Sequence, residues 1–375
     1  IAAPQLCDQR IIIDSVRDGL AHLDVLGGAF LRSGGQVIDA DAFGHIQAGA
    51  LPVLDRSRSG AVHLVNDVHI ARQQGRDTRR RIPRISKEMG YVPSAIARGL
   101  ATNRTSTLGV VVMEPLEAFN ADMVSAINRT ACEYGYSVIL SICDPDPERE
   151  MSAIRLLLQQ RVDAIIVPDP QIAGSALPQL EQVGVPVILI NRDSYAFSVG
   201  TDSIDGARQA TEHLLNLNHR RIAYIGGTRS AEESLQRQQG YTQALQARGI
   251  SPDPLLVVQG DGWHGGGKRC MEQLLALPQP PTAVFCFNDV TASGVLQALH
   301  NAALRVPEDV SVVGFDDSSL ASCLLPPLTT VAQPMDALAR LALRTAFDQL
   351  AEHETSTRVI LSGKLIVRES TGPCP

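Results

Sequence analysis

Carboxylate and amide side chains stand directly after three apolar runs of the sequence. They are Asn191, the pair Asn288 and Asp289, and the pair Asp316 and Asp317. Such groups accept hydrogen bonds from hydroxyls, amides also donate, and an arginine among them donates in a fixed geometry. At the ends of neighbouring strands they would form a site for the adjacent hydroxyl groups of a polyol. The alternative is structural, with Asp289 and Asp317 each serving only as a helix N-cap.

A glycine-rich segment, residues 260–269, contains both a G-x-G-x-x-G and a G-x-x-x-x-G-K pattern. A phosphate-binding loop needs Ser or Thr after the lysine to hold magnesium, and Arg269 stands there instead. The dinucleotide pattern belongs to the first strand of a sheet, whereas this segment follows a later one. We therefore interpret the segment as a flexible loop that lines a cleft, with Trp263 as a candidate stacking surface.

The sequence offers little for catalysis or for a metal. It has no G-x-S-x-G or H-E-x-x-H motif, and its nine histidines form no cluster. The seven cysteines show neither a C-x-x-C pair nor zinc-type spacing, which is typical of free thiols in a reducing compartment. No apolar run reaches the ~18 residues of a membrane span. We expect a cytoplasmic protein that is not an enzyme and has no cofactor, no metal site and no membrane segment.

Unbroken aliphatic runs alternate with amphipathic segments from residue 108 onward. This alternation predicts parallel sheets covered by helices on both faces. The pattern then starts again, so we predict an α/β fold with two doubly wound lobes, a chain that crosses between them more than once, and a ligand in the cleft between them. The predicted strands are 108–112, 137–143, 164–167, 186–191, 222–225, 255–258, 283–287, 310–315 and a terminal pair within 359–368; the predicted helices are 119–134, 148–160, 174–183, 203–217, 231–248, 266–277, 290–302 and 335–352.

Residues 91–100 are a candidate hinge. Pro93 can begin a helix but not continue one, and the two turns that follow are too short to be stable alone. The segment lies within a basic region, 72–104, which has nine Lys or Arg residues against Asp77 and Glu88 in a chain of net charge −7. A local basic region on an acidic protein fits contact with phosphates. A helix-turn-helix pattern from residue 68 fails, because Pro83 would fall inside its second helix.

An ordered set of short motifs extends through most of the chain. They are 77–82, 88–100, 107–112, 135–136, Asp202, 206–207, 213–214, 219–223, 226–227, Arg237, 240–241, 288–289, 306–317, 327–331 and 333–334. Together they resemble the lactose/galactose repressor family, from the end of the DNA headpiece through the hinge helix into the sensor. The resemblance covers about residues 77–371.

The resemblance implies a homodimeric transcriptional regulator with a periplasmic-binding-protein-like sensor. The paired hinge helices would enter the minor groove of operator DNA, with Leu100 as the wedge and Ala97 beside it. An effector, by default a sugar or sugar acid, would change the angle between the lobes and so the operator affinity. The effector contacts implied by the motifs are Phe119, Asn120, Asn191, Arg237, Trp263, Asn288 and Asp316.

The N-terminal part departs from the family pattern, since no helix-turn-helix is recognisable before residue 77. Either the helix-turn-helix that recognises the operator sequence is lost, or residues 1–76 come from a misread frame or a wrong start. We therefore expect weak or absent operator binding by this chain as written. The predicted division is 1–76 unassigned, 77–106 headpiece remnant and hinge helix, 107–200 with about 329–348 as the first lobe, and 201–328 with about 349–371 as the second lobe.

Two other classes of function remain as alternatives. A solute-binding or chemoreceptor-type protein would have the same two lobes without a DNA function, and an enzyme would use the glycine-rich segment on a nucleotide. The basic region and the hinge favour the regulator. If the protein is a regulator, Arg237→Ala is predicted to abolish effector binding while the fold stays intact.

Overall fold

The computed structural model describes the chain most fully from residue 104 onward. Its two compact units are residues 1–94 and 95–375. In the first unit only an antiparallel pairing of β1 (Phe30–Ser33) with β2 (Gln36–Asp39) is described. The predicted hinge, with Ala97 and Leu100, lies outside the described residues. The described residues are 30–33, 36–39, 104–114, 117–144, 146–172, 174–227, 231–351 and 358–375.

The first lobe is built on a sheet of six parallel strands in the order β13-β7-β6-β5-β3-β4. Strands β5 and β6 are apolar throughout, as burial on both faces requires. The strands are β3 (Thr107–Met113), β4 (Ser137–Cys143), β5 (Ala164–Pro168), β6 (Val187–Ile190), β7 (Ser198–Thr201) and β13 (Val359–Leu361). The helices are α3 (Ala118–Glu133), α4 (Pro147–Gln159), a 3-10 turn η2 (Gly174–Ala176), α5 (Leu177–Leu180) and α10 (Met335–Leu350).

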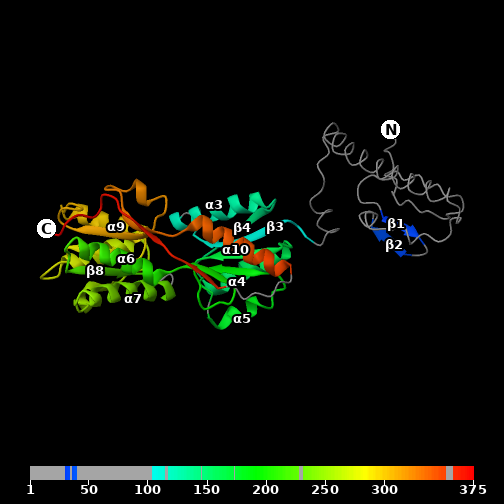
Figure 1. The fold of residues 1–375 in the computed structure, drawn as a ribbon, viewed down its shortest axis with the longest axis horizontal. Coiled ribbons are helices and arrows are strands. Elements are labelled where there is room, and N and C mark those ends of the chain that lie inside the picture. Colours follow the sequence, from blue (N-terminus) through cyan, green and yellow to red (C-terminus); the bar gives the residue numbers. More distant parts are fainter. Residues whose placement is uncertain are drawn as a thin grey trace, which may run out of the picture. The chain divides into compact units, whose positions relative to one another are not determined.

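Alternate side chains of β3 divide the core of the first lobe into two layers. Leu108 and Val110 pack with α3 and α10, whose apolar faces meet them through residues such as Met123 and Leu343. Val111 points to the other face, where it packs with α4 and α5. In Figure 1, α3 and α10 lie side by side on one face of the sheet, with α4 and α5 on the opposite face.

The second lobe repeats this plan with the strand order β14-β12-β11-β10-β8-β9, of which only β14 is antiparallel to its neighbour. Helices α6 and α7 cover one face, and α8 and α9 cover the other. The strands are β8 (Ile222–Gly226), β9 (Val257–Gln259), β10 (Ala283–Cys286), β11 (Ser311–Asp316), β12 (Thr329–Ala332) and β14 (Lys364–Ile366). The helical segments are α6 (Ser203–Asn216), α7 (Ala231–Ala247), η3 (Pro254–Leu256), α8 (His264–Leu275), α9 (Asp289–Asn301) and η4 (Ala321–Cys323).

The prediction of two doubly wound lobes is confirmed, and the chain crosses between them three times. The crossings follow β7, β12 and β13. The predicted terminal strand pair is wrong, because β13 joins the first sheet and β14 the second. The predicted division of the C-terminal part also differs. Strand β12 pairs in the second sheet, although residues 329–348 are predicted for the first lobe, and β13 pairs in the first sheet, although residues 349–371 are predicted for the second. Helix α10 packs in the first lobe.

Two local predictions also differ from the structure. The predicted helix 174–183 is only the turn η2 followed by four residues of α5, which begins at Leu177 with Pro178 in its first turn. Strand β7 was not predicted, because its sequence Ser-Val-Gly-Thr contains a single aliphatic residue. It is nevertheless fully buried, since pairing with β6 and β13 encloses it.

Only residues 260–263 of the glycine-rich segment form a loop, and from His264 onward the segment is helix α8, two residues before the predicted start at residue 266. Gly267 of α8 and Gly294 of α9 allow the two helices to approach closely: a Cβ on Gly267 would lie 2.1 Å from the Thr291 carbonyl oxygen, and one on Gly294 would lie 1.9 Å from that of His264. No side chain fits at such distances. The helix crossing therefore accounts for these glycines, and phosphate binding is not needed to explain them.

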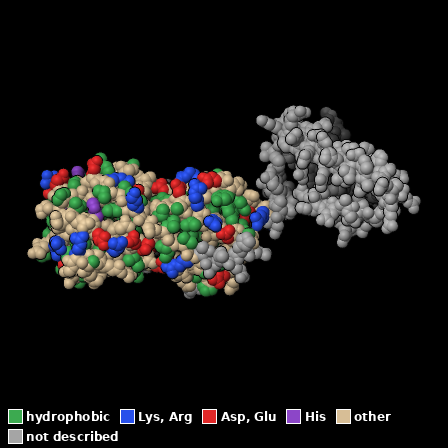
Figure 2. Space-filling view, viewed as in Figure 1, with side chains coloured by type: hydrophobic (Ala, Val, Ile, Leu, Met, Phe, Trp, Pro, Cys, Tyr) green, Lys and Arg blue, Asp and Glu red, His purple; other side chains and the backbone are tan. Residues whose placement is uncertain are grey.

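The visible surface of the two lobes carries charges of both signs. Figure 2 shows Lys and Arg side chains interspersed with Asp and Glu, without a large region of one sign. No helix among the described residues is long and apolar enough to cross a membrane. Within the described part of the chain the six cysteines, from Cys132 to Cys374, are free thiols.

Candidate functional site

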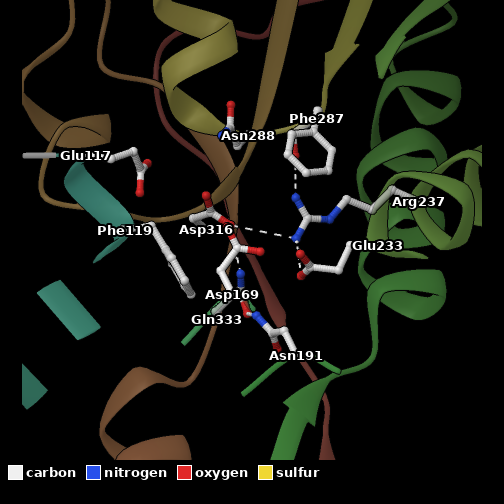
Figure 3. A pocket seen from close by; sticks show the side chains of 10 residues that line it. All are labelled: Glu117, Phe119, Asp169, Asn191, Glu233, Arg237, Phe287, Asn288, Asp316 and Gln333. Atoms are coloured by element: carbon white, nitrogen blue, oxygen red, sulfur yellow. Dashed lines mark hydrogen bonds and ion pairs between the residues drawn. The ribbon is translucent and has the colours of Figure 1, made fainter. Parts of the chain in front are cut away.

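A cleft of about 290 Å³, partly open to solvent, lies between the two lobes. Its side chains come from the carboxyl ends of strands in both sheets, from the first turn of α3 and from the first two turns of α7 (Figure 3). The lining residues are Glu117, Phe119, Asp169, Asn191, Glu233, Arg237, Phe287, Asn288, Asp316 and Gln333.

Five of the seven predicted effector contacts line this cleft: Phe119, Asn191, Arg237, Asn288 and Asp316. Their role in binding an effector stays a prediction.

The other two predicted contacts do not line it. Asn120 is 1% exposed and points into the lobe, where its Nδ2 donates to the Met113 carbonyl oxygen at 2.8 Å. Trp263 occupies the N-cap position of α8, and its backbone N–H donates to Asp261 at 2.9 Å. Both predictions came from motif position, which does not determine the direction of a side chain.

The cleft also contains five residues that the sequence prediction missed. Asp169 follows β5, so the strand-end signal used for the other residues applied to it as well. Glu233 precedes Arg237 by one helical turn, and Phe287 immediately precedes Asn288. Glu117 and Gln333 had no such signal, because neither directly follows an apolar run.

Arg237 is the most enclosed charged residue of the cleft. Its side chain is 2% exposed, and its guanidinium lies over the rings of Phe287 and Phe315, 4.5 and 3.8 Å from their centroids. Nη1 donates to the Phe287 carbonyl oxygen at 2.6 Å, and Nη2 donates to Glu233 at 3.0 Å. Asp316 lies 3.9 Å from Nη2. Stacking and hydrogen bonds together fix the orientation of this side chain.

Gln333 joins the two lobes at the second crossing. Its Nε2 donates to Asp316 of the second lobe at 2.7 Å. Its Oε1 accepts from Asn191 Nδ2 at 3.1 Å and from the Thr201 hydroxyl at 2.8 Å. This buried amide therefore connects the ends of β6, β7 and β11, and it is itself part of the cleft lining.

We expect Gln333→Ala to lower the free energy of unfolding by about 2 kcal/mol, because buried partners lose a hydrogen bond each. The loss should also weaken the coupling between the lobes. Urea unfolding checks the first effect, with the exposed Gln273→Ala as the control. An unchanged stability for Gln333→Ala would show that water replaces the amide without cost.

Three residues at the carboxyl ends of strands, where the chain reaches the cleft, have unusual backbone φ angles. Asp169, Asn191 and Asp316 have φ angles of 47°, 62° and 110°. This left-handed region is uncommon for residues other than glycine, although Asn and Asp tolerate it best. The conformation turns each side chain at a strand end toward the cleft, and such backbone outliers often occur at functional sites.

The alternative of a helix N-cap fails for both Asp289 and Asp317. Asn288 is the N-cap of α9 and accepts the Thr291 N–H at 2.8 Å. Asp289 is buried and accepts from the backbone N–H of Ser318 at 2.8 Å, and burial raises the pKa of its carboxyl to about 7. Asp317 instead accepts from Arg368 at 2.6 Å. Both aspartates thus hold the loop that follows Asp316.

The cleft is acidic. Four carboxyl groups and a single arginine line it. Burial raises the pKa of Asp316 well above its usual range, although the nearby Arg237 acts to lower it. Among the described residues, no group of three or more His, Cys, Asp or Glu side chains is arranged to hold a metal ion. The cleft therefore presents mainly hydrogen-bond acceptors, amides and two aromatic rings.

Two lobes with three crossings and a polar cleft between them define a sensor of the periplasmic-binding-protein type. A model of the periplasmic binding protein-like domain matches residues 211–371. The chain is 33% identical to the HTH-type transcriptional repressor CytR of Escherichia coli K12 over 302 residues, which is 80% of this chain and 89% of that protein. It is 34% identical to the ribose operon repressor of the same organism over 270 residues, 71% of this chain and 82% of the relative.

Solved structures agree with these relatives. The lac repressor dimer bound to operator and an anti-inducer has a TM-score of 0.68 and 28% identity, covering 75% of this chain and 99% of that one. The complex of the regulator CelR with cellobiose has a TM-score of 0.65 and 34% identity, covering 78% and 90%. The chain belongs to the lactose repressor (LacI) family of transcriptional regulators. It is a ligand-responsive regulator, and the solute-binding alternative is not favoured.

The match to CytR also reaches beyond the sensor. A match over 80% of the chain is longer than the described sensor, residues 104–375, and so includes part of the sequence before it. The similarity to a DNA-binding repressor is therefore not confined to the two lobes.

Proposed function

We propose that this protein is a repressor whose operator binding is controlled by a small, neutral, hydroxylated effector held in the cleft. The observation that carries the proposal is the set of groups in the cleft: carboxylates, amides and aromatic rings around one arginine. Carboxylates and amides pair with adjacent hydroxyls, and aromatic rings cover the apolar faces of a sugar.

The acidic lining favours a sugar over a sugar acid. Two of the five N–H donors of Arg237 bond to Phe287 and Glu233, and the Glu233 carboxylate already balances its charge. An anionic ligand would meet the charges of the neighbouring carboxylates in a partly desolvated cleft, where like charges repel strongly. Hydroxyl groups would instead donate to them.

Both lobes contribute to the cleft, so the effector would bind best to one relative orientation of the lobes. Phe119 and Asp169 come from the first lobe, and Arg237 and Asp316 from the second. A ligand that contacts both sets shifts the population toward the orientation in which all contacts form. In a homodimer this change would alter how the two DNA-binding parts are held, and so the affinity for operator DNA.

The names of the relatives agree with this ligand class. One relative is a ribose operon repressor, and one solved regulator is a complex with cellobiose. Ribose and cellobiose are both neutral sugars. We extend this class to the present chain. Its place of action would be the cytoplasm, where the operator is, and the proposed function includes no catalytic step.

A thermal-shift screen tests the proposal. The panel pairs neutral compounds (D-ribose, cellobiose and D-glucose) with anionic ones (D-gluconate, D-glucuronate and ribose 5-phosphate), and it includes ATP and NAD for the enzyme alternative. We expect at least one neutral compound to raise the melting temperature and no anionic compound to do so, because a ligand that binds only the native state stabilises it. A shift with the acids alone would contradict the assignment. A shift with ATP or NAD alone would instead support the nucleotide enzyme.

A further inference from the structure

Glu150 is a carboxylate buried inside the first lobe. It lies in the first turn of α4 and is 0% exposed. Its Oε2 accepts the backbone N–H of Gln171 at 2.9 Å. Among the described residues its other oxygen, Oε1, has no hydrogen-bond partner. A buried carboxylate with one oxygen unsatisfied is costly, so its presence calls for an explanation.

The loop that Glu150 holds is part of the cleft wall. It connects β5 to η2, and its first residue, Asp169, lines the cleft. The loop has a second tie, because Arg192 Nη2 donates to the Ile172 carbonyl oxygen at 3.0 Å. Arg192 also lies 3.6 Å from Glu232 on α7 of the second lobe. The loop is therefore held by Glu150 on α4 and by Arg192, which follows β6.

We propose that Glu150 is a positioning residue, which holds the loop 169–172, and with it the Asp169 carboxylate, in place for effector binding. Glu150 does not line the cleft and acts only through the loop. The proposal rests on the proposed function in one respect, that the effector binds in this cleft.

The charge state of Glu150 decides how well the loop is held. Burial raises the pKa of the Glu150 carboxyl to about 8, and the nearby Asp169 acts in the same direction, while the backbone N–H groups of Gln171 and Ile172 and the charge of Arg192 act against it. The Cys143 thiol also faces Glu150, and burial raises the pKa of this thiol to about 11. Near neutral pH Glu150 is therefore largely neutral, which avoids a buried charge, while Oε2 still accepts the Gln171 N–H.

Ionisation of Glu150 at higher pH would leave a buried negative charge with an unsatisfied oxygen, behind the charge of Asp169. A carboxyl whose pKa is raised on folding makes the folded form less stable as the pH rises from the pKa in the unfolded chain to the pKa in the folded chain, here about 8. Water entering to solvate the charge would loosen the loop. Effector affinity should therefore fall between pH 7 and pH 9.

Hydrogen exchange on the full chain, without ligand, tests the positioning role. In Glu150→Leu, which removes the acceptor, the Gln171 amide should exchange about tenfold faster than in the wild type, the equivalent of one lost hydrogen bond. Glu150→Gln keeps the shape and an acceptor, so exchange at pH 7 should match the wild type. After correction for intrinsic rates, going to pH 9 should speed exchange at Gln171 in the wild type but not in Glu150→Gln.

Glu148→Gln is the matched control, because Glu148 is an exposed acid in the same first turn of α4. It should behave as the wild type at both pH values. Peptides from β10 in the second lobe should be unchanged in every variant, which separates a local effect from global unfolding. Equal exchange at Gln171 in Glu150→Leu and the wild type would overturn the proposal, as would an equal change in Glu148→Gln.

Calorimetric titration with D-ribose and cellobiose completes the test. The affinity of the sugar that binds should fall severalfold from pH 7 to pH 9 in the wild type and stay constant in Glu150→Gln. A parallel fall in both proteins would overturn the link between Glu150 and the cleft. If neither sugar binds, the proposed function loses support, while the exchange result still decides whether Glu150 holds the loop.

Discussion

Arg237→Ala is expected to abolish effector binding and to lower the free energy of unfolding by about 3–5 kcal/mol. The guanidinium is buried between Phe287 and Phe315 and is bonded to Glu233. Its removal would leave Glu233 and Asp316 as buried acids without their cation, together with a cavity between two rings. The sequence alone predicted lost binding with an intact fold. The structure adds an expected loss of stability, because Arg237 is buried in the core as well as lining the cleft.

Urea unfolding and sugar titration measure the two effects separately. Arg237→Lys retains a charge but loses the planar fork and the stacking, so it should recover part of the stability and little of the binding. Arg220→Ala is the control, since Arg220 is exposed and outside the cleft. Wild-type stability in Arg237→Ala would show that the buried acids need no cation, and wild-type affinity would remove Arg237 from the site.

Gly267→Ala is expected to lower the free energy of unfolding by roughly 3 kcal/mol, because the added methyl group would overlap the backbone of α9. The overlapping atom is the Thr291 carbonyl oxygen, at 2.1 Å, and a backbone atom cannot rotate away. The two helices would have to separate, which would also move Asn288 at the N-cap of α9. Urea unfolding of the variant measures the cost.

Gly265→Ala is the matched control two residues away in the same helix. The nearest atom to its added methyl group would be the flexible end of Arg269 at 3.4 Å. Replacing an exposed helical glycine with alanine normally stabilises by about 0.5–1 kcal/mol. If both variants lost stability equally, the close crossing of α8 and α9 would not explain the glycine-rich segment.

Sequence reasoning found the parts of the fold that depend on local pattern. The aliphatic runs predicted the central strands, since a parallel strand buried on both faces needs apolar residues at every position. Strand-end position also identified Asn191 and Asp316, because parallel strands bring their carboxyl ends to one edge. The same rule would have found Asp169.

Features set by tertiary contacts could not be predicted in this way. Strand β7 is buried because neighbouring strands enclose it, although its own side chains are mostly not aliphatic. Strands β13 and β14 pair in different sheets, although only Ser362 and Gly363 separate them. Gln333 belongs to the cleft because a chain crossing places it beside Asp316. Trp263 shows the converse, since a prominent aromatic residue in a suggestive motif lies at the start of a packed helix.

The most direct test of the effector site is a crystal structure of the full chain with the neutral sugar that binds most tightly. Our account predicts electron density for the sugar between the lobes, near Phe119 and Phe287, with its hydroxyl groups donating to Asp169 or Asp316. Density for the sugar at any other place on the chain, with the cleft occupied only by solvent, would contradict it.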